Sequence, residues 1–313
     1  MYIVTHRTLF FTITGILLAI ALGAIAVFGL PRSIDFTGGS LVEVSYTNTR
    51  PTIDALTQNV KQLALGEISL RESGVNGAIL RTRTLTPAEH EKVLTALGSQ
   101  SGTTTPAAFT ELRFNSIGPS LGTELAKKAV YALAAVILAI MFYIAWAFRR
   151  VSKPVSSWTY GLIVVVILFH DVIIPAGFYA ILCHFTGSQV DSLFVVALLA
   201  ILGYSVNDTI VIFDRVREHL HNNEHAKLVE PFELTVGKSV TETLGRSINT
   251  SLTVVLALAA LVLFGSKETV DFALVLLVGV IAGTYSSILL AAPLLVPLAK
   301  RLDRVDVGGK KRK

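Results

Sequence analysis

The stretch Gly203-Tyr-Ser-Val-Asn-Asp208 lies near the end of an apolar run from Leu193 to Phe213. A run of about 20 apolar residues is long enough for a helix that crosses the hydrocarbon core of a bilayer. Asp208 is the only charged residue of this run. A carboxylate at the centre of a bilayer costs at least about 2.5 kcal/mol, so it usually faces the protein interior or a wet cavity and has a function there. The alternative is a structural Asp that satisfies a neighbouring helix.

Polar residues cluster around Asp208 in the sequence: Tyr204, Ser205, Asn207 and Thr209. They can hydrate or hydrogen-bond a carboxylate that gains and loses a proton. A second polar stripe follows later in the chain, at Arg246, Asn249, Thr250 and Thr253. Its spacing of three and four places these residues on one helical face. We expect this face to pack against the helix of Asp208; the alternative is that Arg246 only reaches towards lipid phosphates.

Composition indicates a membrane protein. The chain has 313 residues, of which 52% are hydrophobic and 16% are charged, whereas a soluble domain is about 25% charged. The apolar residues form six blocks, at Leu9–Leu30, Ala129–Phe148, Val155–Phe185, Leu193–Phe213, Ile248–Gly265 and Phe272–Ala299. We therefore predict a polytopic α-helical membrane protein with six transmembrane helices. The first block exceeds the roughly 7–15 residues of a signal-peptide core, so we interpret it as an uncleaved anchor.

Charge and cysteine content exclude other classes. The net charge is +5, but much of the basic excess lies at block ends and in the tail Lys310–Lys313. That distribution is typical of membrane orientation, so we expect no nucleic-acid partner. The single cysteine, Cys183, excludes an internal disulfide and resembles no metal site. We expect no metal and no cofactor, with the lipid bilayer as the surrounding medium.

The blocks divide the chain into segments. We predict an N-terminus and first helix at 1–30, an exported domain at 31–122, and further helices at 123–150, 151–186, 187–213, 247–266 and 267–299. A loop at 214–246 and a basic tail at 300–313 complete the chain. The positive-inside rule places both termini and the basic loops in the cytoplasm. Phe232, Val236, Val240 and Leu244 recur every four residues, which predicts a short amphipathic helix on the inner membrane surface.

The exported segment has the composition of a soluble domain. Strand patterns at Leu41–Tyr46, Glu67–Glu72, Ala78–Arg83 and Phe109–Ser116 alternate with helix patterns at Pro51–Leu65 and from Thr86 to Gly98. The order β-α-β-β-α-β predicts an α+β domain of ferredoxin-like fold. We find no catalytic pattern in it, and we interpret His90 as part of a solvated helix face.

Small residues indicate close helix packing in two spans. Ala19 and Gly23 form one pair four residues apart, and Gly279 and Gly283 form another. Such pairs let helix backbones approach each other closely within a membrane.

Four stretches together resemble the SecF members of the SecD/SecF family, within the resistance-nodulation-division superfamily. They are Ile34-Asp-Phe-Thr-Gly-Gly39, Phe169-His-Asp-Val172, the run from Gly203 to Glu218, and Arg246-Ser-Ile-Asn-Thr-Ser-Leu-Thr253. The resemblance spans nearly the whole chain. It implies one six-helix half of a pseudo-symmetric pair with SecD, and a periplasmic domain of ferredoxin-like fold.

The resemblance also implies a function. Such a protein uses the proton-motive force to help preproteins through late steps of translocation at the SecYEG channel of the Sec translocon in the cell inner membrane. YajC and SecA are further partners that the resemblance implies. The family's intramembrane Asp falls on Asp208 and its fifth-helix Arg on Arg246, which implies proton transfer at these residues. Asp171 is interpreted as a supporting polar residue, and no enzymatic activity is expected.

Two other functions stay open at this point. An intramembrane aspartyl protease would use Asp171 and Asp208 as its two carboxylates, but the chain has no Gly-x-Gly-Asp signature, and a nearby Arg works against the proton that such a pair shares. A small-molecule export pump of the same superfamily is the second alternative. The short exported domain argues against it, because a drug pocket needs about 300–1,000 Å³.

Overall fold

The computed structural model describes residues 2–99, 107–149 and 155–299. These residues form two compact units, a helical unit made of Met1–Pro31 and Tyr131–Lys313, and a smaller unit at Arg32–Val130. The helix α6 (Pro119–Ala147) begins in the smaller unit and ends in the helical one.

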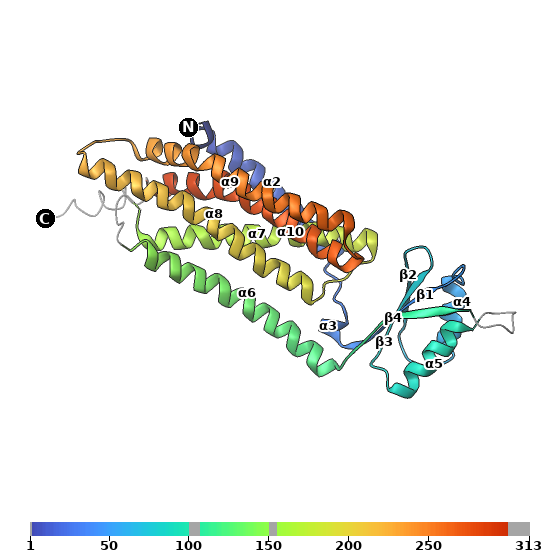
Figure 1. The fold of residues 1–313 in the computed structure, drawn as a ribbon. Helices are drawn as coiled ribbons and strands as arrows, with labels where there is room; N and C mark the ends of the chain where they lie inside the picture. Colours follow the sequence, from blue (N-terminus) through green and yellow to red (C-terminus); the bar gives the residue numbers. More distant parts are fainter. Residues whose placement is uncertain (1, 100–106, 150–154, 300–313) are drawn as a thin grey trace. The chain divides into compact units, whose positions relative to one another are not determined.

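The helical unit contains the long helices that the sequence predicts (Figure 1). They are α2 (Arg7–Phe28), α6, α7 (Ser157–Thr186), α8 (Ser192–His225), α9 (Phe232–Phe264) and α10 (Lys267–Ser286). The last of them continues through a π-helical turn, η1 (Ser287–Ala291), towards Ala299. Among the described residues, six helices are long and apolar enough to cross a membrane. The prediction of six spans is therefore confirmed, and α1 (Tyr2–Thr5) is a short turn before the first of them.

Two helices extend further than the sequence indicates. The predicted fourth span ends at Phe213, whereas α8 continues to His225. The prediction of a separate amphipathic helix at the membrane surface is wrong, because Phe232–Phe264 is one continuous helix. The side chains of Val236 and Val240 are buried in the same core as α7 and α8. Their four-residue spacing marks a face that packs on the other helices rather than on lipid headgroups.

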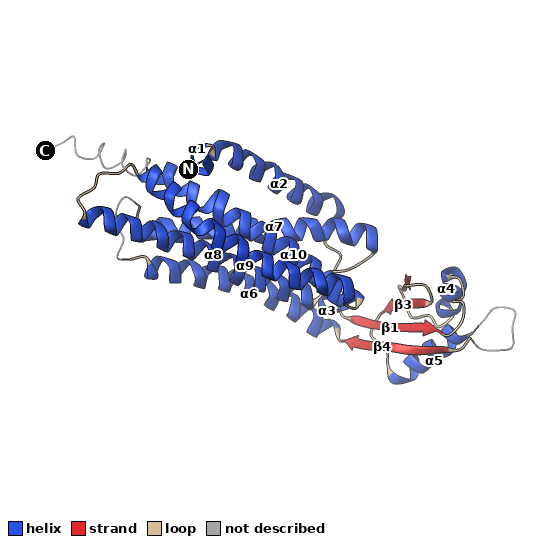
Figure 2. Ribbon diagram, turned by 45° about the horizontal axis from the view of Figure 1, so that its top comes forward, coloured by secondary structure: helices blue, strands red, loops and turns tan. Residues whose placement is uncertain are grey.

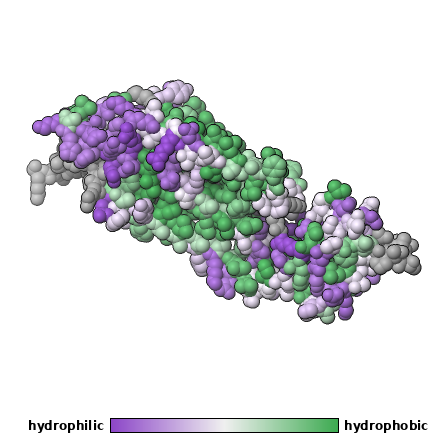
Figure 3. All heavy atoms as spheres, in the orientation of Figure 1, coloured by the Kyte–Doolittle hydropathy of each residue, from purple (hydrophilic) through white to green (hydrophobic). Residues whose placement is uncertain are grey.

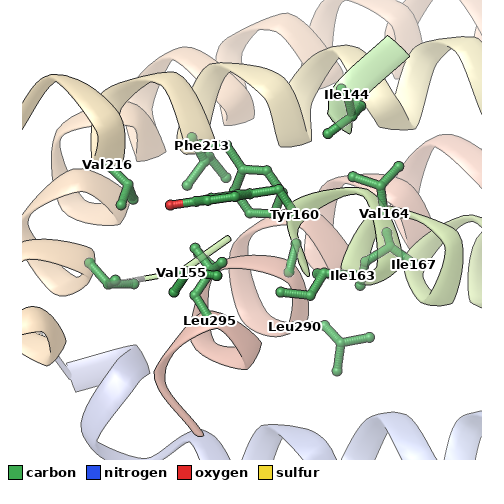
Figure 4. Packing of buried hydrophobic residues seen from close by; sticks show 14 of the residues in the cluster. Ile144, Val155, Tyr160, Ile163, Val164, Ile167, Phe213, Val216, Leu290 and Leu295 are labelled. Atoms are coloured by element: carbon green, nitrogen blue, oxygen red, sulfur yellow. The ribbon is translucent and has the colours of Figure 1, made fainter. Parts of the chain in front are cut away.

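The core of the helical unit lies between α7, α8 and the end of α10. Figure 4 shows the ring of Tyr160 beside Phe213, with Ile163, Val164 and Leu295 close by. The ring centroids of Tyr160 and Phe213 are 5.1 Å apart in an edge-on arrangement, which suits the charge distribution of aromatic rings. On the outside, apolar side chains cover the helices, and hydrophilic ones gather where α8 and α9 meet their connecting turn (Figure 3).

Two glycines of α10 bring this helix into close contact with α8. A methyl group on Gly283 would lie 3.0 Å from the Cβ atom of Ser205, and one on Gly279 would overlap Ile201. The predicted packing role of Gly279 and Gly283 is thus confirmed, between α10 and α8. The other predicted pair makes no close helix contact within the described chain, because Ala19 is exposed and Gly23 has no neighbouring atom within 4 Å of such a methyl group, so its packing role stays a prediction.

The first span makes its close contact through a different residue. A methyl group on Gly177 of α7 would lie 2.5 Å from the Cα atom of Ala21 on α2. The two backbones touch at this position, and Ala21 is buried there. Small residues do mediate the contact of α2, but they lie one on each helix, so the pattern within α2 alone does not identify them.

The smaller unit is the predicted α+β domain (Figure 2). Its strands are β1 (Gly39–Tyr46), β2 (Ser69–Ser73), β3 (Gly77–Thr82) and β4 (Phe109–Ile117), in the sheet order β2-β3-β1-β4 with all neighbours antiparallel. The helices α4 (Ile53–Lys61) and α5 (Pro87–Gly98) separate the strands along the chain, as in a split βαβ arrangement. Val42, Val44 and Leu80 of the sheet form one buried core with Leu56 and Val93 of the helices.

The interpretation of His90 as a solvated surface residue is wrong. Its Nε2 atom lies 2.9 Å from Oε1 of Glu111 on β4, and its ring stacks on Phe114 with centroids 3.9 Å apart. The helix pattern around His90 shows only its own charged neighbours, Glu89 and Glu91, whereas these contacts come from a strand 20 residues later.

The sequence Gly38-Gly39 follows the short helix α3 (Ile34–Thr37) and leads into β1. Both glycines have positive φ angles, 75° and 128°. A methyl group on Gly38 would lie 2.5 Å from the Cα atom of Pro119, and one on Gly39 would lie 2.6 Å from the carbonyl oxygen of Thr82. Only glycine combines this backbone conformation with such close approaches.

Candidate functional site

Asp208 connects three helical segments of the unit. Its Oδ1 atom accepts a hydrogen bond from the hydroxyl of Ser247 on α9, and its Oδ2 atom accepts one from the hydroxyl of Ser287 on η1. Both serines are buried, while Asp208 itself is half-buried. Each oxygen of a carboxylate within an apolar span thus accepts one hydrogen bond from a hydroxyl.

Ser287 has a second acceptor within reach. Its hydroxyl oxygen also lies 3.0 Å from the carbonyl oxygen of Thr284, one turn earlier. A serine hydroxyl carries a single proton, so it donates to Asp208 or to Thr284 at any one time. The acceptor of this hydrogen bond depends on the charge of Asp208, because an ionised carboxylate is a stronger acceptor than the carbonyl oxygen of Thr284.

The sequence of α10 explains why Ser287 faces α8. Gly279, Gly283 and Ser287 are spaced by four, so they lie on one helical face, and both glycines contact α8. Helix α10 changes to a π-helical turn at Ser287. Such turns are rare in proteins overall, and those that occur often lie at functional sites.

A second layer of hydroxyls lies one turn from Asp208. The hydroxyl of Tyr204 on α8 donates to Oγ of Ser251 on α9, at 3.0 Å. The same Ser251 oxygen lies 2.6 Å from Oγ1 of Thr284 on α10. Tyr204, predicted as a polar neighbour of Asp208, therefore belongs to a chain of hydrogen bonds that joins α8, α9 and α10 one turn from the carboxylate.

Asp171 belongs to a separate buried network. Its Oδ1 atom lies 2.7 Å from Nδ1 of His170, and its Oδ2 atom accepts a hydrogen bond from the hydroxyl of Ser205 on α8. The other ring nitrogen of His170, Nε2, bonds to the hydroxyl of Tyr285 on α10. The side chain of Asp171 is 0% exposed and that of His170 is 3% exposed. Ser205, predicted as a neighbour of Asp208, thus serves Asp171 instead.

The other predicted site residues make no hydrogen bond or ion pair with Asp208 among the described residues. Arg246 is exposed, and among the described residues no ion pair joins it to Asp208. Asn207, Asn249 and Thr250 are also exposed, and the hydroxyl of Thr250 donates to the carbonyl oxygen of Arg246 at 2.9 Å. Thr209 is buried and donates to the carbonyl oxygen of Ser205 at 3.2 Å. Helix α9 does pack on α8, but the predicted polar face with Arg246, Asn249 and Thr250 is exposed rather than in contact with α8.

In the part of the chain that the structure describes, Asp171 and Asp208 share no hydrogen-bond partner. The partners of Asp208 are Ser247 and Ser287, whereas those of Asp171 are His170 and Ser205. The two aspartates that an intramembrane aspartyl protease would need thus have no hydrogen bond between them. A shared proton requires the two carboxyl groups to be in contact.

Sequence reasoning missed the two serines that hold Asp208. Ser247 follows Arg246 directly and lies four residues before Ser251, which forms a buried row of hydroxyls on α9. Ser287 continues the spacing of Gly279 and Gly283 by one further turn. Both signals are present in the sequence, but a serine within an apolar span is less conspicuous than a charge.

Two family models match the chain. One is described as "Protein export membrane protein SecD/SecF, C-terminal" and matches residues 98–301. The other, "SecD/SecF GG Motif", matches residues 23–49, which include Gly38 and Gly39.

Curated relatives cover nearly the whole chain. The Protein translocase subunit SecF of Anaerolinea thermophila is 39% identical over 296 residues, which are 94% of this chain and 92% of that protein. The protein of the same name from Thermobaculum terrenum is 36% identical over 307 residues, with coverages of 94% and 92%.

Two solved SecDF structures also match nearly the whole chain. The crystal structure of SecDF from Thermus thermophilus, described as a translocon-associated membrane protein, is 30% identical to this chain with a TM-score of 0.76. A second structure, of SecDF in a super-membrane-facing form, is 29% identical with a TM-score of 0.64. Each comparison covers 95% of this chain but only 38% of the SecDF chain, so most of SecDF has no counterpart here.

Proposed function

Because this chain belongs to the SecD/SecF family of protein export membrane proteins, we propose that it is a SecF-type subunit of the Sec translocase that uses the proton-motive force. The site for the proton is Asp208. The observation that carries this proposal is the position of its carboxylate, half-buried in an apolar span and bonded to hydroxyls from two other helical segments. The subunit is a component of a transport machine and not an enzyme, in keeping with the names of its relatives.

Protonation of Asp208 rearranges its hydrogen bonds. The ionised carboxylate accepts one hydrogen bond from the hydroxyl of Ser247 and one from the hydroxyl of Ser287. A neutral carboxyl group carries its own proton and can donate it to the oxygen of Ser287, whose hydroxyl then turns to the carbonyl oxygen of Thr284. Each proton that binds or leaves thereby changes how α8 is bonded to the π-helical turn of α10.

The available free energy is sufficient for a conformational change. One proton that crosses about 150 mV releases roughly 3.5 kcal/mol from the membrane potential alone. A typical coupling free energy between two sites is about 1–3 kcal/mol. Proton passage at Asp208 can therefore bias an equilibrium between two arrangements of the helical unit, and through it the position of the exported domain.

Exposed polar residues on the apolar spans support an intramembrane partner. Asn207 on α8 and Arg246, Asn249 and Thr250 on α9 are all exposed. The bond between Asp208 and Ser247 brings the two helices together at this level. Polar and charged side chains that face lipid are costly, so a second set of spans is expected to cover them. We assign that role to SecD, with Arg246 beside a residue of the partner.

The wider assembly follows from the same proposal. The subunit is a multi-pass protein of the bacterial inner membrane, with both termini and the α8–α9 connection in the cytoplasm and the smaller unit in the periplasm. It works with the SecYEG channel, and with YajC and SecA, on translocating preproteins. Protons are its coupling ions, and the absence of a cofactor or metal stays a prediction.

The test is the substitution Asp208→Asn, which keeps the size of the side chain and removes the proton that it exchanges. Protein export is measured in vesicles that carry a proton gradient, and again after an uncoupler has abolished the gradient. We expect Asp208→Asn to lose the increment in export that depends on the gradient while the protein still assembles with SecD. The matched control is Asp214→Asn on the same helix, since Asp214 is exposed and pairs with Arg217 at 2.9 Å. If Asp208→Asn vesicles keep the full increment, Asp208 is structural and the proposal fails.

A further inference from the structure

A fully buried histidine–aspartate pair lies in α7, apart from Asp208. His170 and Asp171 are adjacent in the sequence, and their Nδ1 and Oδ1 atoms are 2.7 Å apart. The pair ends in a hydroxyl on either side, because Asp171 accepts from Ser205 of α8 and His170 bonds to Tyr285 of α10. The result is one continuous chain of hydrogen bonds across three helices, with no role in the cycle of Asp208 described above.

Among the described residues of α2, α8, α10 and η1, no cation compensates the charge of this pair. From α8 the facing group is Ser205, which does not titrate, and Asp208 is bonded elsewhere. From α10 the facing group is Tyr285, while η1 contains no ionisable residue. The only ionisable residue of α2 is Arg7, which pairs with Glu233. Within the described ranges, no lysine or arginine makes an ion pair with Asp171.

A neutral imidazole beside an ionised carboxylate would therefore leave one uncompensated negative charge within the membrane. Such a charge costs at least about 2.5 kcal/mol at the centre of a bilayer. One additional proton removes the net charge, either as an imidazolium next to a carboxylate or as a neutral imidazole next to a carboxylic acid. The separation of 2.7 Å between nitrogen and oxygen is within the range of charge-assisted hydrogen bonds, about 2.7–2.9 Å.

We infer that the His170–Asp171 pair is a second proton-binding site of the helical unit, which holds one exchangeable proton and is then net neutral. This inference goes beyond the function of Asp208 and does not depend on it. It rests on the burial of the pair, its hydrogen-bonded neighbours and the lack of a compensating cation.

Proton binding at this pair changes its contact with α10. When the imidazole is neutral with its proton on Nδ1, the Nε2 atom accepts a hydrogen bond from the hydroxyl of Tyr285. When both nitrogens carry protons, Nε2 donates to the same hydroxyl, whose own proton must turn to another acceptor. The bond between α7 and α10 thus reverses its direction. Tyr285 lies two residues before Ser287, so both proton sites act on the same part of α10.

The experiment observes the proton directly in the full-length protein, labelled with ¹⁵N-histidine and reconstituted in lipid bilayers. Solid-state NMR at neutral pH reports how many nitrogens of each histidine ring are protonated, and the difference from His170→Gln isolates the signal of His170. Infrared spectra of the same sample, compared with Asp171→Asn, show whether Asp171 has the C=O stretch of a carboxylic acid. We expect an imidazolium or a carboxylic acid, and the reversible loss of that species as the pH is raised.

Two matched variants keep the inference testable if those substitutions disrupt folding. Tyr285→Phe removes the hydroxyl bonded to His170, so it should shift the ring signal. Tyr160→Phe is the control, because Tyr160 of α7 packs on Phe213 of α8 and its hydroxyl has no partner among the described residues. The signal should persist in Asp208→Asn, which separates this site from the proposed function. A neutral ring beside an ionised Asp171 at neutral pH overturns the inference, and so does a proton signal that no change of pH removes.

Discussion

The hydroxyl of Ser287 donates to the carboxylate of Asp208, 79 residues earlier in the chain. Its neighbour Ser286 is equally buried, but its hydroxyl donates only to the carbonyl oxygen of Gly283, at 3.1 Å. Of these two consecutive buried serines, only Ser287 donates a hydrogen bond to Asp208. Ser286 is therefore a matched control for the role of the Ser287 hydroxyl.

Ser287→Ala should reduce the gradient-dependent increment in export, because a hydrogen bond to a charged group contributes about 1.5–3 kcal/mol. The substitution removes the hydrogen bond that joins Asp208 of α8 to η1. Ser286→Ala should retain the increment. The measurement is export in vesicles with and without an uncoupler, at matched amounts of assembled protein. Equal increments in the two variants would show that Ser287 has no part in coupling.

Gly283→Ala should lower the thermal stability of the helical unit. The added methyl group would lie 3.0 Å from the Cβ atom of Ser205, and overpacking of this kind costs about 1–3 kcal/mol. Gly23→Ala is the control, since nothing lies within 4 Å of its added methyl group. Both substitutions gain about 1 kcal/mol of helix propensity, so the difference between their melting temperatures in mild detergent measures packing alone. A Gly283→Ala protein as stable as Gly23→Ala would contradict the close contact of α8 and α10.

Glu89→Gln should make the smaller unit less sensitive to acid. A hydrogen bond from Arg83 lowers the pKa of Glu89 from its ordinary 4.5 to about 2, assisted by the backbone and hydroxyl of Thr86. Because the pKa is lower in the folded state, Glu89 stabilises the fold above about pH 4.5, and this contribution is lost as the pH falls towards 2. Denaturant titrations of both proteins across that range give the comparison. Parallel pH dependences would contradict the stabilising role of the Glu89 carboxylate.

Tyr46→Phe should remove a loss of stability at alkaline pH. Burial raises the pKa of Tyr46 from 10.0 to about 12, while its hydroxyl donates to the carbonyl oxygen of Leu97 at 2.9 Å. The unfolded chain ionises first, so the fold loses stability as the pH rises from 10 towards 12. Tyrosinate absorbance of the parent minus that of Tyr46→Phe should show one group that ionises near pH 12. A group that ionises near pH 10 would show that the ring is accessible to water.

The sequence predicts the elements of this protein well, because each depends on local patterns. Six apolar blocks of sufficient length became six helices, and the alternation at Leu41–Tyr46 became β1. The sheet order β2-β3-β1-β4 agrees with the fold that the element order predicts. The end of α8 was less predictable, since a helix continues into water wherever charged residues with good helix propensity follow.

The candidate site was predictable only at its centre. Asp208 stands out as a charge in an apolar run, whereas its partners Ser247 and Ser287 come from other helices whose rotation depends on packing. The expectation that the face of Arg246 packs on the helix of Asp208 used the correct helix, but it is the next residue, Ser247, that contacts Asp208. Adjacent residues of a helix differ by a rotation of roughly 100° about its axis. The spacing of residues within one helix does not determine which of them faces the neighbouring helix.

The contact between Ala21 and Gly177 has a consequence for the synthesis of the chain. The two residues are about 150 positions apart, with the whole of the smaller unit between them. At about 5–20 residues per second, α2 waits roughly 8–30 s after its own synthesis before α7 is made. During that interval α2 has no partner helix, so lipid alone must solvate it. Its lack of any charge after Arg7 suits a helix that enters the bilayer first and is joined by its neighbour later.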